Sequence, residues 1–394
     1  MEHKAKLTEK QFYTVFAFVT SLFLLWGIAI TLGDALNKHF QNVLKVSKAD
    51  SGLVQFSIFG AYAVMGIPAG LFMKKFGYKN GVLLGLFLYA AGAFLFVPAA
   101  GAESFTFFRI ALFVLACGLA TLETVAHPFA ASLGDQRSSD LRVNFAQSFN
   151  GIGGVIGPLI GAFVIFGGDA VNTTDLTSVK ILYVVIGIVV ASVAIAFSFV
   201  KVPPLTDPHI IATDTYAIGG EIHIEKKLFQ QKHFVFAAIA QFFNVAAQGG
   251  TWAYFINYGH EIVGLSDKSA AVYFSISMVM MMVGRIVGTL LMRFIAPYKL
   301  LAIFAFCNIV MCLIVAQGFG WPSFIALLFI NFFFSIMFPT IFSLGLKDLG
   351  GKTQQASSFI VMGVAGGAVF PYLMGKIANT DVAAAYYLPI ICYT

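Results

Sequence analysis

Charged residues are scarce in this sequence. Only 11% of its 394 residues are Asp, Glu, Lys or Arg, whereas 59% are hydrophobic. A soluble globular protein carries roughly 25% charged residues, so the charges here are too few to cover a water-facing surface. Apolar runs of around twenty residues, each long enough to cross a bilayer, recur from end to end. The composition therefore predicts an all-α membrane protein.

Cysteines and enzyme motifs are also sparse. The four cysteines lie in apolar runs and show neither metal-ligand spacing nor a disulfide pattern. The glycine-rich stretches do not follow a strand, and we find no nucleophile elbow, metal quartet or phosphate loop. The formal charge of +6 is divided among short clusters between apolar runs, which argues against a nucleic-acid partner. We expect no enzyme activity, cofactor or metal.

The apolar runs form two groups of six predicted helices. The first group lies near 12–43, 50–73, 81–100, 105–133, 143–166 and 179–200, and the second lies near 234–258, 268–292, 299–317, 322–345, 355–377 and 382–394. Proline, glycine and charged residues separate the groups, as in a solvated linker. We expect six-helix bundles over 1–200 and 234–394, joined by a cytoplasmic linker over 201–233. The last run is short for a crossing, which suggests a truncated twelfth helix.

Lys and Arg are distributed unequally between the two sets of loops. Sixteen fall in the N-terminal tail, the even-to-odd loops and the linker, and seven fall on the opposite side. Cytoplasmic loops carry the excess of positive charge. The expected protein therefore crosses the inner membrane of a bacterium many times, with its N-terminus in the cytoplasm and the lipid bilayer as its surroundings.

The two groups of helices resemble each other. At offsets of 211 and 213 residues, Pro128, Ser132, Leu133, Gly134 and Pro158 recur as Pro339, Ser343, Leu344, Gly345 and Pro371. Parallel six-helix repeats are typical of the major facilitator superfamily fold, whose halves rock around a site near the bilayer midplane. The glycines of the fifth and eleventh helices are expected to allow close contact where the halves slide past each other.

Two acids lie inside predicted spans, where an ionised side chain is costly and is a functional candidate by default. Asp34 is on the first helix and Glu123 is on the fourth. Because these helices run in opposite directions, we expect Asp34 nearer the outside and Glu123 nearer the cytoplasm. Either carboxyl could carry a coupling proton. The structural alternatives are an interfacial position for Asp34 and simple pairing for Glu123.

Polar side chains near these acids and on the seventh helix are candidates for binding a sugar. His127 follows Glu123 by one helical turn, although a lone histidine in a helix is more often a packing or hydrogen-bonding residue. Amides and an aromatic ring suit a neutral polyol, whereas the alternative for each amide is a bond between helices. The candidate binding residues are Asp34, Thr31, Glu123, His127, Gln147, Asn150, Gln241, Asn244, Gln248 and Trp252.

Several segments resemble one known family. The segments LLWGIAITLGD, LETVAHPF, RVNFAQSFN, PTIFSLGLKDLG and SSFIVM are similar to those of the bacterial fucose, galactose and glucose proton symporters of the major facilitator superfamily. The likeness covers nearly the whole chain. It implies proton coupling and sugar binding by Asp34 and Glu123 and a cavity position for Gln147. Thr31 and His127 each replace an asparagine of the family, and Lys74 stands where an acid is usual in the superfamily.

The resemblance implies import of a hexose-type sugar by proton symport with alternating access, in a protein that functions as a monomer. Sodium coupling remains open, because oxygen atoms of Asp34 and Thr31 could coordinate an ion. A sugar sensor that keeps the fold without transporting is a further alternative. A drug and proton antiporter is disfavoured by the amide-rich helices.

Overall fold

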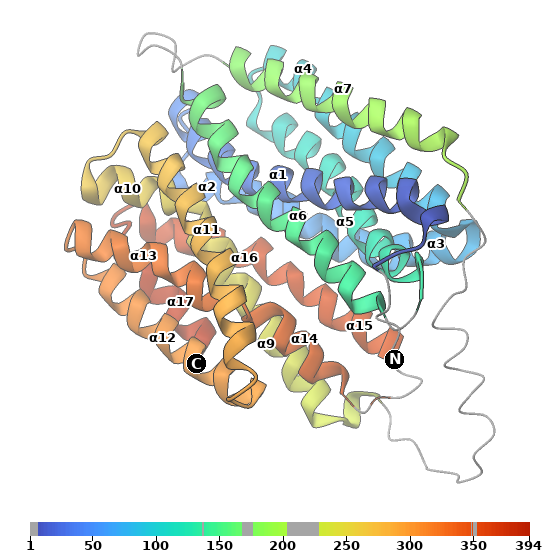
Figure 1. Cartoon of the computed structure of the whole chain (residues 1–394). Helices are drawn as coiled ribbons and strands as arrows, with labels where there is room; N and C mark the ends of the chain where they lie inside the picture. Colours follow the sequence, from blue (N-terminus) through green and yellow to red (C-terminus); the bar gives the residue numbers. More distant parts are fainter. Residues whose placement is uncertain (1–6, 136–137, 168–175, 203–227, 348, 350–352) are drawn as a thin grey trace.

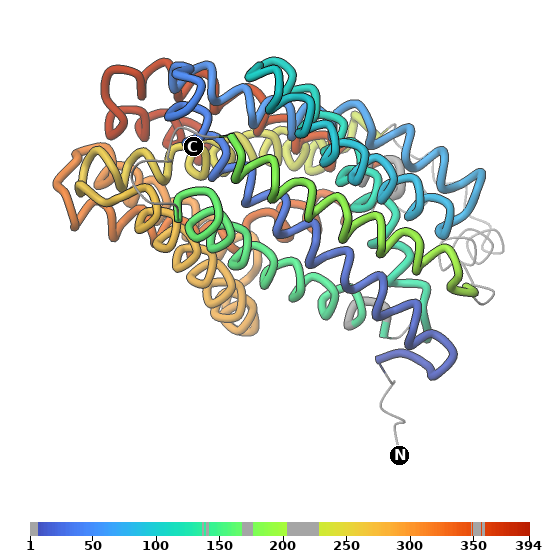
Figure 2. The backbone as a smooth tube through the Cα atoms, turned by 90° about the horizontal axis from the view of Figure 1, so that it is seen from above, coloured from blue at the N-terminus to red at the C-terminus, as the bar shows by residue number. Residues whose placement is uncertain are grey.

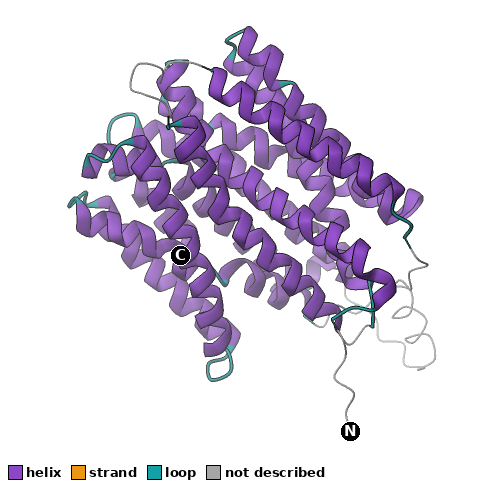
Figure 3. Ribbon diagram, turned by 45° about the horizontal axis from the view of Figure 1, so that its top comes forward, coloured by secondary structure: helices purple, strands orange, loops and turns teal. Residues whose placement is uncertain are grey.

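The computed structural model describes residues 7–135, 138–167, 176–202, 228–347, 349 and 353–394. These residues form helices joined by short connections, and no strand occurs among them (Figure 3). The helices of residues before 200 pack beside those after 228, and the two groups lie side by side (Figures 1 and 2). The expected fold, two helical bundles, is confirmed.

The first half contains six crossings of the bundle. Its elements are α1 (Tyr13–Val43), α2 (Lys48–Ser51), α3 (Leu53–Phe94), α4 (Phe96–Gly101), α5 (Phe105–Ser132), α6 (Ser139–Ile160) with a π-helical turn η3 (Gly161–Ile165), and α7 (Thr177–Phe199). We call the end of the bundle at which α1 finishes the Val43 end.

The second half repeats this pattern with more interruptions. Its elements are α9 (Lys232–Ala253), α10 (Phe255–Val263), α11 (Asp267–Leu291), α12 (Pro297–Ala316), α13 (Trp321–Phe334), α14 (Met337–Leu346), α15 (Thr353–Met362), η7 (Gly363–Ala365), α16 (Gly366–Ala378) and α17 (Tyr387–Tyr393). The repeated prolines occupy matching places, Pro128 within α5 and Pro339 within α14. Most of the expected linker, residues 203–227, lies outside the described residues.

In the described part of the chain, nine helical stretches are long and apolar enough to cross a membrane. One stretch spans 54 residues, Lys48–Gly101, which as a straight helix would be about 80 Å long, against a hydrocarbon core of about 30 Å. Gly77 breaks it with φ at +82°, a conformation that glycine adopts without steric cost. The second and third expected helices are therefore two crossings joined by a tight turn.

The glycine-rich helices serve a different contact from the one expected. A Cβ atom at Gly153 would strike the backbone of α1 at Leu24, and one at Gly366 would strike the backbone of α9 at Phe242. Both contacts lie within one half. Gly151, beside Met282, and Gly367, beside Phe59, do face the opposite half. The expectation of glycines lining the sliding surface is thus wrong for much of the set, because close helix packing within each half requires them.

Arg142 fastens the connection between α5 and α6. Its guanidinium is fully buried and donates to the backbone oxygens of Ala130, Ala131 and Leu7. The last carbonyl groups of a helix have no partner within the helix, and they carry a partial negative charge that favours a cation. Arg142 therefore closes the end of α5 and holds the chain before α1 against it.

Candidate functional site

Asp34 lies in the interior of the bundle on α1. Its side chain is 2% exposed, and its Oδ1 accepts a hydrogen bond of 2.5 Å from Nε2 of Gln55 on α3. The other carboxyl oxygen, Oδ2, has no hydrogen-bond partner. A buried carboxylate with one bonded oxygen is poorly stabilised as an anion, so the surroundings of Asp34 suit a carboxyl that binds a proton.

Glu123 lies on α5 at the end of a chain of hydrogen bonds. The indole Nε1 of Trp26 on α1 donates to the Tyr62 hydroxyl at 2.5 Å, and this hydroxyl, on α3, lies within reach of the Glu123 carboxyl and can donate to it. A small cavity adjoins the acid, lined by Leu22, Phe23, Trp26, Leu122, Glu123 and Ala126. Three helices therefore orient Glu123 toward a cavity.

His127 connects Glu123 to the sixth helical element of the first half. Its Nδ1 lies 2.9 Å from the backbone oxygen of Glu123, and its Nε2 lies 2.6 Å from Nε2 of Gln147 on α6. An amide nitrogen can only donate, so His127 accepts at Nε2 and carries its proton on Nδ1. Phe23 packs edge-on against the imidazole at 4.9 Å. This pattern of bonds suits a neutral imidazole.

Thr31 and Asn150 hold α1 and α6 together. The Thr31 hydroxyl donates to the backbone oxygen of Gly27 at 3.0 Å, and it fills the space that a Cβ at Gly157 would occupy. Asn150 donates to the backbone oxygen of Phe23 at 3.4 Å. In this state Thr31, which was expected to bind sugar, is engaged in helix packing.

The amides of α9 are buried without partners. Gln241 is 0% and Asn244 2% exposed, and none of their four polar side-chain atoms forms a hydrogen bond. Each buried polar group left unpaired costs about 1–3 kcal/mol. A cost of this size in one short stretch of helix is typical of a place where a polar ligand or water supplies the missing bonds.

Trp252 and Gln248 differ from these two amides. Trp252 donates from Nε1 to Oδ1 of Asn331 at 2.8 Å, and Asn331 in turn donates to Ser277. The indole nitrogen is therefore used within the second half, and its ring packs against Phe274. The structure favours a packing role for Trp252 over the expected sugar contact, whereas Gln248 is half-buried.

Gln55, Tyr62 and Trp26 were not among the residues predicted from the sequence. Gln55 and Tyr62 are seven residues apart on one helix, a spacing of two turns that places them on the same face. On that face, Gln55 contacts Asp34 and Tyr62 contacts Glu123. Polar residues at this spacing in an apolar helix were a signal, but their partner helix could only be identified in three dimensions.

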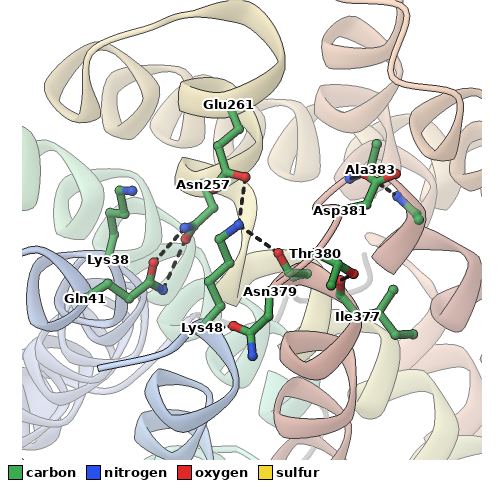
Figure 4. Close-up of polar contacts among 12 residues, drawn as sticks. Lys38, Gln41, Lys48, Asn257, Glu261, Ile377, Asn379, Thr380, Asp381 and Ala383 are labelled. Atoms are coloured by element: carbon green, nitrogen blue, oxygen red, sulfur yellow. Dashed lines mark hydrogen bonds and ion pairs between the residues drawn. The ribbon is translucent and has the colours of Figure 1, made fainter. Parts of the chain in front are cut away.

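Side chains from both halves meet at the Val43 end (Figure 4). Lys48 lies 2.7 Å from Oε2 of Glu261 and also donates to the backbone oxygen of Ala378, and Gln41 exchanges hydrogen bonds with Asn257. We call this set the polar seal. Its members in the first half are Asn37, Lys38, Gln41, Asn42 and Lys48, and those in the second half are Ala253, Asn257, Glu261, Asp267, Ala378 and Asn379.

The polar seal lies beyond Asp34 along α1. Asn37, three residues after Asp34, donates to the backbone oxygen of Ala253 at 2.6 Å. Tyr254 adds a further link, because its hydroxyl lies 2.8 Å from the backbone oxygen of Lys48 and 2.7 Å from that of Pro371. The halves are therefore joined at the Val43 end, with Asp34 beneath the joint and Glu123, level with Trp26, deeper in the first half.

Comparison with known proteins agrees with this architecture. The family model of the Major Facilitator Superfamily matches residues 12–371. The chain is 37% identical to the L-fucose-proton symporter of Escherichia coli (strain K12), over 96% of this chain and 90% of the relative. It is 33% identical to the glucose/galactose transporter of Brucella abortus biovar 1 (strain 9-941), over 99% and 94%.

A solved structure is similar along the same length. The transporter FucP in its outward conformation matches with a TM-score of 0.69 and 35% identity, covering 98% of this chain and 97% of that one. The relatives are named as transporters and not as enzymes. The chain belongs to the Major Facilitator Superfamily, in the group that includes these bacterial transporters.

Proposed function

We propose that this protein imports a hexose-type sugar, such as fucose, galactose, glucose or a related compound, together with a proton by alternating access. The observation that carries the proposal is that two buried acids with supporting partners lie in one half, whereas two buried amides without partners lie in the other. Asp34 and Glu123 lie in the first half on bonded supports, while Gln241 and Asn244 lie unpaired in the second half. The names of the relatives, a fucose-proton symporter and a glucose/galactose transporter, support the same reading.

The acids supply the coupling in this proposal. Dehydration favours the neutral form of a carboxyl, and contact with water or a cation favours the charged form. As each carboxyl passes from the buried state to a cavity that opens on one side, it exchanges its proton with that side. The Tyr62 hydroxyl keeps Glu123 oriented through this exchange, and Gln55 does the same for Asp34.

The amides supply the recognition. A sugar hydroxyl both donates and accepts, and each amide of Gln241 and Asn244 also offers donors and acceptors. A bound sugar would supply the hydrogen bonds that these amides lack in the empty protein. Its affinity would therefore include the free energy of pairing these buried groups. Asn150 and Gln147 would contribute from the opposite half once their present bonds rearrange.

The side facing each compartment follows from the distribution of positive charge. If the loops rich in Lys and Arg face the cytoplasm, the N-terminus is cytoplasmic and the Val43 end faces outward. The polar seal then closes the outer side, so that this state is open, or opens, toward the cytoplasm. We further propose bundles over 1–200 and 234–394 with a cytoplasmic linker over 201–233, a bacterial inner-membrane location and function as a monomer.

Transport by purified protein in liposomes tests the proposal. A panel of radiolabelled hexoses is offered under a proton gradient, under a sodium gradient and without either. We expect uphill uptake of at least one hexose with the proton gradient alone. Uptake that requires the sodium gradient would mean that sodium, and not a proton, is the coupling ion. Binding of sugar without accumulation under any gradient would favour a sensor.

A further inference from the structure

Two buried oxygen atoms near the polar seal lack hydrogen bonds. They are Oδ2 of Asp34 and Oδ1 of Asn37, on side chains that are 2% and 0% exposed. Both residues are on α1, three positions apart, a spacing at which side chains on a helix are neighbours. Each of these two unpaired acceptors, in one turn of a buried helix, needs a donor.

The remaining polar atoms of both side chains are occupied. Gln55 donates to Oδ1 of Asp34, and Nδ2 of Asn37 donates to the backbone oxygen of Ala253 at 2.6 Å. These bonds fix which oxygen of the carboxyl and which atom of the amide remain available. A proton on Oδ2 of Asp34 would turn that oxygen into a donor, and Oδ1 of Asn37, one turn further along the same helix, is an unpaired acceptor.

We propose that Asn37 is the positioning residue that links protonation of Asp34 to closure of the Val43 end. With Asp34 neutral, a hydrogen bond to Oδ1 holds the Asn37 amide in the orientation in which it donates to Ala253 of the opposite half. With Asp34 ionised, two acceptors oppose each other, and the Asn37 amide turns or withdraws, which weakens the contact between halves. The inference rests on the proposed function, in which Asp34 exchanges the coupling proton.

Other charged groups lie near this part of α1. Lys38 is 4.0 Å from Asp267 on α11, and His260 is 3.2 Å from the same carboxylate. His39 packs against Phe166, next to the π-helical turn. On α5, Arg109 lies over the ring of Phe105, which contacts Phe40 of α1. The experiment must separate any effect of these charged and polar groups from that of Asp34.

The link makes closure depend on protonation with a defined sign. Acidification favours the closed Val43 end, because neutral Asp34 satisfies both oxygens, and loss of the proton favours opening. For a single linked proton the ratio of closed to open molecules changes by at most about tenfold per pH unit. A carrier with this property reopens its outer side after the proton leaves, which is the step that a symporter must complete without sugar.

Distance measurements between the halves test the link. Spin labels are placed at Ala102→Cys, after α4, and at Thr380→Cys, after α16, in full-length protein whose four cysteines have been replaced. Double electron–electron resonance in lipid nanodiscs measures the distance distribution between the labels, which gives the closed fraction from about pH 5 to about pH 8. We expect this fraction to rise on acidification in the parent protein. Asp34→Asn, whose amide donates like the neutral acid, should remain closed throughout.

Two variants separate a link from a simple contact. Asn42 also bridges the halves, donating to Asp267 at 2.7 Å, but it is eight residues from Asp34. Asn42→Ala should lower the closed fraction at every pH and retain the pH response. Asn37→Ala should lower it and reduce the response to less than about twofold over the range. Asn37→Leu, which keeps the volume of the side chain, replaces Asn37→Ala if the latter does not fold.

The outcomes distinguish the inference from the proposed function. If Asp34→Asn removes the pH response and Asn37→Ala retains it as Asn42→Ala does, the Asn37 link is wrong and the role of Asp34 stands. If the response survives in Asp34→Asn, or is absent from the parent protein, the proton assignment to Asp34 is overturned together with the link.

Discussion

The two halves share their helix order and their repeated prolines but differ in the bonding of the residues proposed for proton coupling and for sugar recognition. In the first half Asp34, Glu123 and His127 each have a side-chain partner on another helix. In the second half Gln241 and Asn244 have none. Glu261 and Asp267, two acids of the second half, lie at the Val43 end in the polar seal.

This difference shows how a duplicated fold divides its work. A group that gains and loses a proton requires fixed surroundings, because its neighbours set the relative free energies of its two protonation states. Groups that bind a neutral ligand can remain unsatisfied until the ligand arrives, at a cost in stability. The first half therefore suits proton exchange and the second half suits sugar recognition. Each of the following substitutions tests one side of this division.

The largest effect is expected from Glu123→Gln. The amide keeps hydrogen bonds but cannot carry the proton. A potential of about 100 mV supplies about 2.3 kcal/mol per proton, enough for about fiftyfold accumulation. The variant should therefore lose nearly all uphill uptake while sugar exchange across liposomes continues. Glu103→Gln, an exposed acid, is the matched control and should accumulate normally; normal proton cotransport in Glu123→Gln would exclude it from coupling.

A smaller effect on the opposite half is expected from Gln241→Leu and Asn244→Leu. Loss of a hydrogen bond to the sugar should weaken equilibrium binding by about tenfold. The melting temperature without sugar should stay the same or rise, because an unpaired buried amide is removed. Trp252→Phe provides the contrast, since it leaves Asn331 without its donor and should lower the melting temperature. Destabilisation by Gln241→Leu would instead indicate that the amide joins helices.

An intermediate test of the first half is Tyr62→Phe, which keeps the ring and removes the hydroxyl between Trp26 and Glu123. Losing one hydrogen bond to the acid, worth about 1 kcal/mol, should reduce proton-driven uptake about fivefold and leave exchange unchanged. Tyr89→Phe, in the part of α3 beyond the break at Gly77 and with a longer bond of 3.4 Å to Leu25, is the control. Equal losses in both variants would show that the hydroxyl of Tyr62 has no special role.

The smallest effect is expected from His127→Asn. Neutral His127 accepts from Gln147, and protonation at low pH would remove that acceptor and force the Gln147 amide to turn. Uptake measured from about pH 5 to about pH 8 should therefore show a flatter profile in the variant, with a change in rate below about threefold. An identical profile would limit His127 to packing, and complete loss of uptake by folded protein would make it essential.

Helix positions were predictable because spans are set by bilayer thickness. α1 and α5 begin and end within one residue of the predicted bounds, 12–43 and 105–133. The positions of Asp34 and Glu123 along their helices also followed from helix direction. Breaks such as that between α13 and α14 were missed, since hydropathy is unaffected by a local change in backbone geometry.

Partners between helices were not predictable from one sequence. Periodicity shows which face of a helix is polar, but it does not show which helix that face meets, so Gln55 and Tyr62 were not identified. The same limit explains the error about the glycines. Gly153 and Gly366 showed that close packing was needed, and only the fold shows that α1 and α9 of the same half require it.

A mechanical consequence follows from the spacing of Gln55 and Tyr62. Both side chains stand on a single rigid segment of α3, two turns apart, and the proline that could bend this helix, Pro68, comes after both. A tilt of this segment therefore moves the side chains that support Asp34 and Glu123 at the same time. The helix thus couples the two acids mechanically. Inserting a single residue between positions 55 and 62 would turn the two supports onto different faces of α3 and would end this coupling.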